Sequence, residues 1–491
     1  MRKLILAAVC CLLPATQVLA APNNAKDVDM LVAAMMQQTP IIDDLKQLTD
    51  TIGGRLTGSK ANEKAVQWAL DKFKQAGVKV QKEAFTMPRN WQEVNTSAKV
   101  YGKGIAFEPQ VVSQPFTPDS SNMSGGIVDI KHGTAEDFAA QAVKGKWLLV
   151  QTMILDDVAG IGGLFQEYKD APSIEKMALK QQARGVIYMS SRPKNLLYRR
   201  GPSVGPRNTL PIMQMQREHA KRVVRLLSAG HDLSFSPTVS VASSGEYTSH
   251  NIVAEITGSK YPDQYVVIGA HLDSFDLGTG ALDNGSNSVI MIDLARQIKR
   301  LDLRPKRTMR FVLYNGEEQG MYGSWAYTKT HADELDKTVM TATMDIGTGR
   351  VNGVMTNGRN DYSDAIKQVL KPVAALGPFS EIDHPVVGTD NYDFMMQGVP
   401  NLILSQTDSN YASNYHAQSD TFDKVDQRQL KLNSAIAAAL IYGFANIENV
   451  NWQRQSLKDL EAMINSTDLP MQMVSFGLWK SWADNQRGMK H

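Results

Sequence analysis

The stretch "YVVIGAHLDSFDLGTGALDNGSN", residues 265–287, joins an apolar segment to a group of acidic side chains. The segment "YVVIGA" is predicted to be a buried strand because it is short and apolar. His271 follows it directly, and Asp273, Asp276 and Asp283 come within the next twelve residues. Carboxylates that are crowded together repel one another and are costly to bury. The stretch therefore predicts either a cation-binding site or a loop that is open to water.

Short apolar strands and helical segments alternate from residue 251 to about residue 446. The predicted strands are "YVVIGA", "TMRFVLYN", "VMTATMDI" and "NLILS", and helices are expected over residues 284–299, 321–330 and 430–446. Strands that are apolar on both faces and alternate with helices indicate a sheet covered on both sides. The predicted fold class is therefore α/β, with a mostly parallel (mixed) sheet sandwiched by helices. In such sheets, functional side chains gather at the carboxyl ends of the strands.

Polar groups follow each of these strands, at the point where the strand is predicted to end. They are His271 with Asp283, the pair Glu317–Glu318, Asp345 and His416. Each group has an ordinary structural explanation on its own: a histidine after a strand is seldom a ligand, adjacent glutamates are usually solvated, and "DLGTG" is a good turn. Their joint occurrence at successive strand ends favours a shared site in one crevice.

The donor types in this set are imidazole and carboxylate, without sulfur. Such donors suit zinc, with cobalt or manganese as substitutes. The negative charge of three carboxylates exceeds the charge of one divalent ion, so two ions that share one carboxylate are favoured. Asp283 is the expected shared ligand because it begins a helix whose dipole stabilises an anion. Asp273 is placed to hold the other ring nitrogen of His271. Of Glu317 and Glu318, one would bind metal and the other would act as a general base. This set suits amide hydrolysis by two ions.

The first twenty residues are predicted to be a secretory signal. Two basic residues precede the apolar run "LILAAVCCLL", and small residues in "QVLAAP" suit cleavage near residue 20. The apolar run is too short to span a membrane. Its removal also removes Cys10 and Cys11, so the mature chain would have no disulfide, and it leaves 50 basic against 50 acidic residues. This balance argues against nucleic-acid binding by bulk charge, and a cysteine-free exported chain indicates the periplasm or the medium.

The middle of the chain has a different pattern of short apolar runs, each typical of a β-strand. The strand-like runs "GGIVDI", "KWLLVQ" and "GVIYMS" predict a small inserted α/β module. We expect a signal peptide at 1–20, an N-terminal part of the main domain at 21–120, the insert at 121–243, the catalytic part at 244–450 and a tail at 451–491. The basic loop "SRPKNLLYRRGPSVGPR", residues 191–207, is either a solvated surface loop or a clamp for a substrate carboxylate, with Arg199 as the candidate.

The motifs "GAHLDS", "GALDNGSNSVIMIDLAR", "NGEEQGMYGS" and "MDIG" resemble those of the co-catalytic di-zinc exopeptidases. The likeness is strongest to the carboxypeptidase Q group, and it extends to "TIGGRLTGSKANEKAVQWAL" and "NYHAQSDTFDKVD". It therefore covers most of the chain. The resemblance implies a zinc-exopeptidase fold, with residues 121–243 similar to a protease-associated domain.

The resemblance also implies roles for individual residues. His271 and Asp345 would hold one zinc, Glu318 and His416 the other, with Asp283 bridging them. Glu317 would be the general base and Asp273 the partner behind His271, and a cis peptide bond is expected at Asp283–Asn284. Asp390, in "TDNYDFMMQGVP", matches an acid that supports the ligands. Apart from the resemblance, Tyr415 is a candidate for stabilising the oxyanion because it precedes the ligand His416.

The leading hypothesis is an exported enzyme with two zinc ions that hydrolyses dipeptides or terminal residues of short peptides. An aminopeptidase of the same fold remains open because the sequence does not reveal which substrate terminus is anchored. A mono-zinc acyltransferase of the glutaminyl cyclase type and a non-catalytic binding protein are alternatives. The complete ligand set together with Glu317 argues against a binding protein. The expected partners are small peptide substrates. Neither nucleic-acid binding nor a membrane span is expected, and a homodimer is compatible with the sequence.

Overall fold

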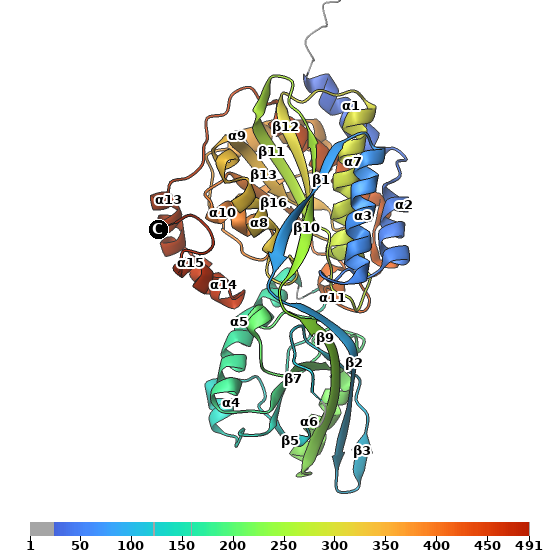
Figure 1. Cartoon of the computed structure of the whole chain (residues 1–491), viewed down its shortest axis with the longest axis vertical. Helices are drawn as coiled ribbons and strands as arrows, with labels where there is room; N and C mark the ends of the chain where they lie inside the picture. Colours follow the sequence, from blue (N-terminus) through green and yellow to red (C-terminus); the bar gives the residue numbers. More distant parts are fainter. Residues whose placement is uncertain (1–23, 121–122, 159, 491) are drawn as a thin grey trace, which may run out of the picture.

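The computed structural model describes residues 24–120, 123–158 and 160–490. The predicted signal peptide lies outside the described residues. The chain forms two eight-stranded sheets, which lie one above the other in Figure 1. The upper sheet is flanked by most of the helices, and the lower sheet carries α4–α6.

The upper sheet has the strand order β1-β10-β12-β11-β13-β16-β14-β15. Its strands are β1 (Lys79–Met87), β10 (Tyr247–Ile256), β11 (Tyr261–His271), β12 (Arg307–Tyr314), β13 (Thr338–Thr343), β14 (Val351–Met355), β15 (Ser380–Ile382) and β16 (Asn401–Gln406). The four central strands β12, β11, β13 and β16 are parallel, while β1, β10 and β14 pair antiparallel to their neighbours. The predicted mixed α/β sheet is therefore confirmed, and its parallel centre contains the four predicted strands.

Helices cover both faces of this sheet, as its apolar strands require. One face shares a core with α1 (Asn24–Met36), α2 (Ile41–Lys46), α3 (Lys60–Gln75), α7 (Ser286–Arg300), α9 (Ser363–Leu370) and α12 (Gln427–Asn446). The opposite face packs against α8 (Tyr322–Thr330) and α10 (Asn391–Met396). Ile268 and Ala270 of β11 face the first core, and Val267 between them faces the second. This alternation explains why the strand is apolar throughout.

The lower sheet has the strand order β3-β2-β9-β5-β6-β7-β8-β4. Its strands are β2 (Asn90–Gly102), β3 (Ile105–Phe107), β4 (Val111–Ser113), β5 (Gly125–Asp129), β6 (Trp147–Val150), β7 (Gly185–Met189), β8 (Ile212–Met215) and β9 (Leu233–Ser244), and its helices are α4 (Ala135–Ala139), α5 (Gly160–Lys180) and α6 (Arg217–Ser228). We call residues 90–244 the lower unit. This unit begins at Asn90, earlier than the predicted insert, because the long strand β2 pairs with β9 along most of its length.

The C-terminal tail folds back onto the upper unit. Its helices are α13 (Leu457–Ser466), α14 (Leu469–Ser475) and α15 (Trp479–Ala483). Leu460 and Met473 share an apolar cluster with Met395 of α10. Phe476, directly after α14, stacks on Tyr168 of α5 with ring centroids 4.7 Å apart. The tail therefore connects the α10 side of the upper sheet to the lower unit, as the positions of α14 and α5 in Figure 1 show.

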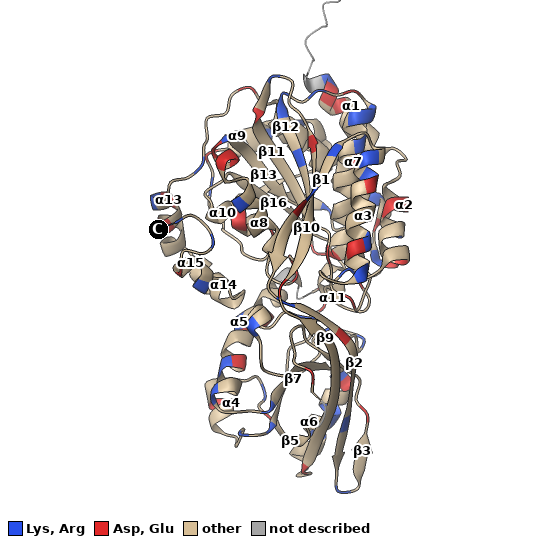
Figure 2. Ribbon diagram, viewed as in Figure 1, with Lys and Arg blue, Asp and Glu red and all other residues tan. Residues whose placement is uncertain are grey.

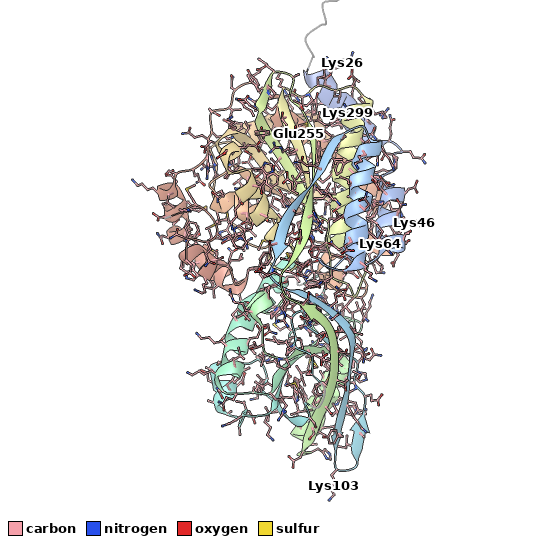
Figure 3. The ribbon with its side chains drawn as sticks, viewed as in Figure 1. Lys26, Lys46, Lys64, Lys103, Glu255 and Lys299 are labelled. Carbon is pink, nitrogen blue, oxygen red and sulfur yellow. The ribbon has the colours of Figure 1, made fainter. Side chains whose placement is uncertain are left out.

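Short helical segments complete the chain between these elements. They are η1 (Gln47–Ile52), η2 (Gly205–Arg207), η3 (Ala281–Gly285), η4 (Ala332–Lys337), η5 (Lys371–Leu376), α11 (Tyr411–Asn414) and η6 (Phe422–Lys424). Acidic and basic residues are interspersed along α1, α3 and α7 (Figure 2). The side chains of Lys46 and Lys103 point away from the fold (Figure 3). Within the part of the chain that the structure describes, no helix has the length and apolarity needed to cross a membrane.

Candidate metal centre

The carboxyl ends of the central strands bring the five predicted ligands together. Their donor atoms form two groups, and within each group the atoms lie within 4.8 Å of one another. One group contains His271, Asp283 and Asp345, and the other contains Asp283, Glu318 and His416. Asp283 belongs to both groups. This is the arrangement expected of two cation sites that share one carboxylate.

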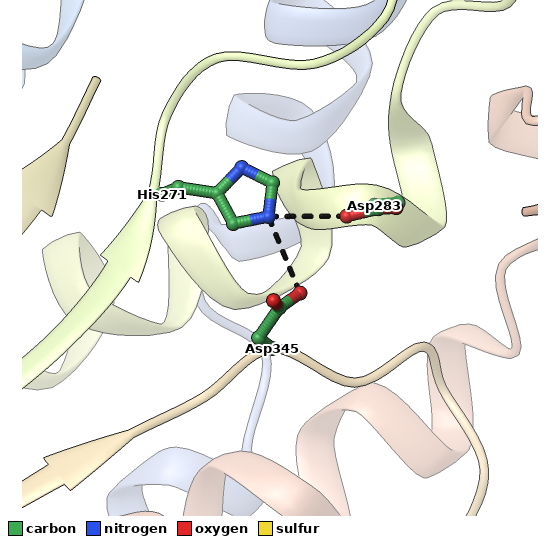
Figure 4. A group of neighbouring side chains, drawn as sticks. All are labelled: His271, Asp283 and Asp345. Carbon is green, nitrogen blue, oxygen red and sulfur yellow. Dashed lines mark hydrogen bonds and ion pairs between the residues drawn. The ribbon is translucent and has the colours of Figure 1, made fainter. Parts of the chain in front are cut away.

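Asp283 presents one oxygen to each group. Nε2 of His271 lies 3.1 Å from Oδ1 of Asp283 and 3.2 Å from Oδ1 of Asp345 (Figure 4). On the other side, Nε2 of His416 lies 3.2 Å from Oδ2 of Asp283 and 3.0 Å from Oε2 of Glu318. The Asp283 carboxylate thus lies between the two histidines and contacts each of them through a different oxygen. The second acidic partner is Asp345 for His271 and Glu318 for His416.

Backbone carbonyl groups orient both histidine rings. Nδ1 of His271 lies 3.0 Å from the carbonyl oxygen of Asp273, and Nδ1 of His416 lies 3.0 Å from that of Arg199. In each ring, Nδ1 therefore donates to the carbonyl oxygen, which leaves the lone pair of Nε2 facing the site. The prediction for Asp273 is corrected in one respect: its backbone oxygen holds the ring, while its carboxylate oxygen is 3.7 Å away.

The Asp273 carboxylate instead supports the turn that carries the two glutamates. Its Oδ2 accepts a hydrogen bond of 2.7 Å from the hydroxyl of Thr57, and Thr57 in turn accepts one of 2.9 Å from the amide of Gly316. The amide of Glu317 donates to Oδ1 of Asp273 at 3.4 Å. Thr57 lies in "TIGGRLTGSK", but nothing in that motif alone indicates that its hydroxyl supports this turn.

Two further buried residues, Arg55 and Asp420, hold the loop that carries Asp283. The guanidinium of Arg55 is fully buried and donates to the carbonyl oxygens of Leu272, Gly53, Thr279 and Gly280. The carboxylate of Asp420 accepts hydrogen bonds from the amides of Leu282 and Asp283, at 2.6 and 3.1 Å. The expected cis peptide bond is present at Asp283–Asn284. Sequence reasoning missed Arg55 and Asp420 because their partners are backbone atoms.

Burial and the crowded carboxylates shift the pKa values of the site. Burial, reinforced by the charge of Asp283, raises the pKa of Glu318 to about 7. Burial alone would lower the pKa of His416, but the charges of Glu318 and Asp283 raise it to about 9. Burial also raises the pKa of Glu317 well above its usual value. The site therefore attracts positive charge strongly.

The other predicted site residues lie around the five ligands. Glu317 and Tyr415 line a cavity beside His416, and the Tyr415 ring stacks on the His416 ring at 3.5 Å between centroids. Asp390 begins α10 and is fully buried, and neither of its carboxyl oxygens has a hydrogen-bond partner among the described residues. Burial raises the pKa of Asp390 to about 8. The nearby charges of Asp273 and Asp345 add to this rise, so Asp390 lies close to the ligands but is hydrogen-bonded to none of them.

The cavity that opens on Glu317, Glu318 and His416 has a volume of about 380 Å³. This lies within the usual range of small-molecule pockets, about 300–1,000 Å³. Its walls come from the strand ends and α8 of the upper unit, from the lower unit, mainly the loop 201–207, and from the C-terminal tail. The residues that line it include Phe116, Tyr168, Arg207, Tyr322, Trp325, Tyr415, Phe476 and Arg487.

The prediction of Arg199 as a substrate clamp is wrong. Its side chain is buried, and its guanidinium pairs with both oxygens of Asp276 and with Glu93 at 3.1 Å. Arg199 therefore joins the lower unit to the loop that carries the metal ligands, and its own carbonyl oxygen holds His416. The sequence does not reveal the pairing of Arg199, because all arginines of the basic loop carry the same side chain and only the fold determines which of them meets a carboxylate.

Comparisons with known proteins agree with this geometry. Residues 251–441 match the model of "Peptidase family M28". Human carboxypeptidase Q is 28% identical over 438 residues, which cover 87% of this chain and 89% of that protein. The crystal structure of a peptidase M28 precursor from Shewanella amazonensis is 27% identical with a TM-score of 0.78, over 88% of this chain and 99% of that one. A zinc aminopeptidase from Bacillus subtilis shares the fold at 18% identity and a TM-score of 0.64, over 87% and 96% of the two chains.

The fold, the clustered ligands and these matches define the chain as a metallopeptidase. The region that matches this family model, residues 251–441, contains all five ligands and Glu317.

The Arg199→Lys variant tests the structural role assigned to this arginine. Lysine cannot form the two-pronged pair with Asp276, so the lower unit should hold His416 less firmly. We expect kcat/KM to fall by about 10-fold, the lower end of the effect of losing a partner behind a metal ligand. The loss should be equal for a dipeptide and for its C-terminal amide, measured side by side. A loss confined to the free carboxylate would restore the clamp hypothesis.

Proposed function

We propose that the chain is an exopeptidase with two zinc ions, which hydrolyses dipeptides or removes terminal residues from short peptides. The observation that carries this proposal is the position of Asp283 between two histidine–carboxylate groups. A mono-zinc enzyme of the glutaminyl cyclase type needs only one such group. A binding protein has no need for Glu317 beside the ligands.

The residues present fit two zinc ions. Each group offers one imidazole and carboxylate oxygens, which are common zinc donors, and the sulfur-free set also accommodates cobalt or manganese. Oδ2 of Asp283 is buried, and its contact among the described residues is Nε2 of His416 at 3.2 Å, without the geometry of a hydrogen bond, as expected for an atom that shares a cation with that ring. When bound, two zinc ions would polarise the scissile carbonyl and lower the pKa of the attacking water.

The chain's own residues would move the proton during hydrolysis. Glu317 lines the cavity next to the ligand Glu318, and its amide is fixed by Asp273. Burial raises its pKa, which makes its carboxylate a good proton acceptor in this setting. In this proposal, Glu317 accepts the proton of the attacking water and then donates it to the leaving amine. Tyr415 would donate its hydroxyl to the oxygen of the scissile carbonyl.

The walls of the cavity favour small substrates. The tail and the loop 201–207 approach each other at Gly477, where an added Cβ would lie 2.6 Å from the carbonyl oxygen of Ser203. The stacked rings of Phe476 and Tyr168 lie beside this contact. A long peptide chain would have to displace these contacts, whereas a dipeptide would not. This enclosure supports cleavage at a terminus rather than within a chain.

The predicted export and domain division belong to the same proposal. A signal peptide over residues 1–20 would deliver the enzyme to the periplasm or the medium. The lower unit would act as the predicted protease-associated-like insert, which completes the substrate cavity through the loop 201–207. The region 244–450 would supply the metal ligands and the general base.

Metal titration with an activity assay tests the proposed function. The protein is dialysed against a chelator, and hydrolysis of leucyl-leucine is then measured after the addition of zero to three equivalents of zinc. We expect negligible activity without metal and maximal activity near two equivalents. Undiminished hydrolysis by the metal-free protein would contradict the proposal, as would no hydrolysis at any zinc level.

A further inference from the structure

Arg207 is a cation on the wall of the cavity whose charge is not neutralised. It ends the turn η2 of the lower unit, is exposed, and lines the same cavity as Glu317, Glu318 and His416. Its guanidinium forms no hydrogen bond or ion pair with any described residue of the chain. The other arginine on the cavity wall, Arg487, is already paired with Asp393 at 2.7 Å and is buried.

The position of Arg207 is set by the rest of the lower unit. The guanidinium of Arg89 donates to the carbonyl oxygens of Pro206 and Asn208, each at 3.3 Å, on either side of Arg207. Ser203 is held by the buried carboxylate of Glu175 through its amide at 2.8 Å. The backbone of the turn is therefore fixed at both ends, while the side chain of Arg207 keeps its donors.

The acidic residues of the cavity are all committed to the metal centre. Among the described residues that line the cavity, the carboxylates are Glu317 and Glu318. Glu318 faces His416, and Glu317 is the proposed base, so a free α-amine of a substrate would meet no other carboxylate on these walls. A free α-carboxylate would meet an unpaired guanidinium, which binds carboxylates through two parallel hydrogen bonds.

We propose that Arg207 binds the free C-terminal carboxylate of the substrate and thereby makes the enzyme a carboxypeptidase or dipeptidase. This inference rests on the proposed peptidase function and specifies which end of the peptide is anchored. The basic loop contains the carboxylate clamp that its composition suggested, but at Arg207 rather than Arg199. Arg207 is thus a specificity-determining residue, remote in sequence from the metal ligands.

The test compares three substrates on the zinc-loaded enzyme: leucyl-leucine, its C-terminal amide and N-acetyl-leucyl-leucine. We expect the wild type to cleave leucyl-leucine much faster than its amide, and cleavage of N-acetyl-leucyl-leucine distinguishes a carboxypeptidase from a dipeptidase, which needs both termini free. In Arg207→Ala, kcat/KM for leucyl-leucine should fall by about 10-fold to 100-fold, mainly through KM, because one charged hydrogen-bonded pair is lost. Cleavage of the amide should not change. Arg207→Lys should recover part of the loss.

Arg225→Ala, which removes an exposed arginine on α6 of the same unit, is the matched control and should behave like the wild type. Equal cleavage of the acid and the amide by the wild type would overturn the inference while leaving the peptidase intact. So would an equal effect of Arg207→Ala on both, or a requirement for the free amine without one for the free carboxylate. If the wild type cleaves none of the three substrates, the proposed function itself fails.

Discussion

Replacement of Glu317 by glutamine is expected to reduce kcat for dipeptide hydrolysis by about 10²–10⁴-fold, the range typical of a lost general base. The amide retains the size of the side chain but cannot accept the proton of the attacking water. The metal ligands are untouched, so zinc content, measured by mass spectrometry of the purified protein, should remain that of the wild type. KM should change little, because Glu317 acts on the reacting water rather than on substrate binding.

Glu246→Gln, an identical change at an exposed turn, serves as the control for the Glu317 variant. It should retain the wild-type rate. A Glu317→Gln variant with a normal rate would remove Glu317 from the mechanism. A variant that loses its zinc would instead place Glu317 among the ligands and exchange its role with that of Glu318.

Replacement of Asp283 by asparagine is expected to affect both metal positions at once. Its two oxygens face His271 and His416 separately, and an amide offers only one oxygen and no charge. Zinc content should fall below that of the wild type under the same dialysis, and kcat/KM should fall by more than about 100-fold, beyond the loss seen when a residue behind a ligand is removed.

The matched control for Asp283→Asn is Asp302→Asn, whose side chain is 89% exposed. This variant should keep full zinc content and activity. If Asp283→Asn retained wild-type zinc and rate, Asp283 would not bridge two ions, and the two groups of donors would need another explanation. Circular dichroism of both variants establishes that the fold is retained before the metal content is compared.

Much of the upper unit could be predicted because its sequence pattern follows directly from its geometry. Buried parallel strands need apolar residues on both faces, as Val267 and Ile268 show. Their carboxyl ends then meet at one edge, which places His271, Asp283 and His416 together although they lie far apart in the chain. The sequence therefore predicted both the sheet and the proximity of the ligands.

The supporting contacts could not be predicted because they depend on tertiary packing. Arg55 and Asp420 act through backbone atoms of the ligand loop, and a sequence does not show which carbonyl or amide groups will lie nearby. The basic loop contains several similar arginines, and only the structure distinguishes the buried, paired Arg199 from Arg207, which pairs with no described residue. Nothing in the sequence of the tail indicates that it lines the cavity. Phe476 is positioned there by stacking on Tyr168 of α5, which is a tertiary contact.

A crystal structure of the zinc-loaded protein, with anomalous diffraction recorded at the zinc edge, tests the two-ion site most directly. We expect two peaks about 3.5–4 Å apart, one on each side of the Asp283 carboxylate. His271 and Asp345 should contact one peak, and Glu318 and His416 the other. A single peak, or two peaks that do not share Asp283, would contradict the account.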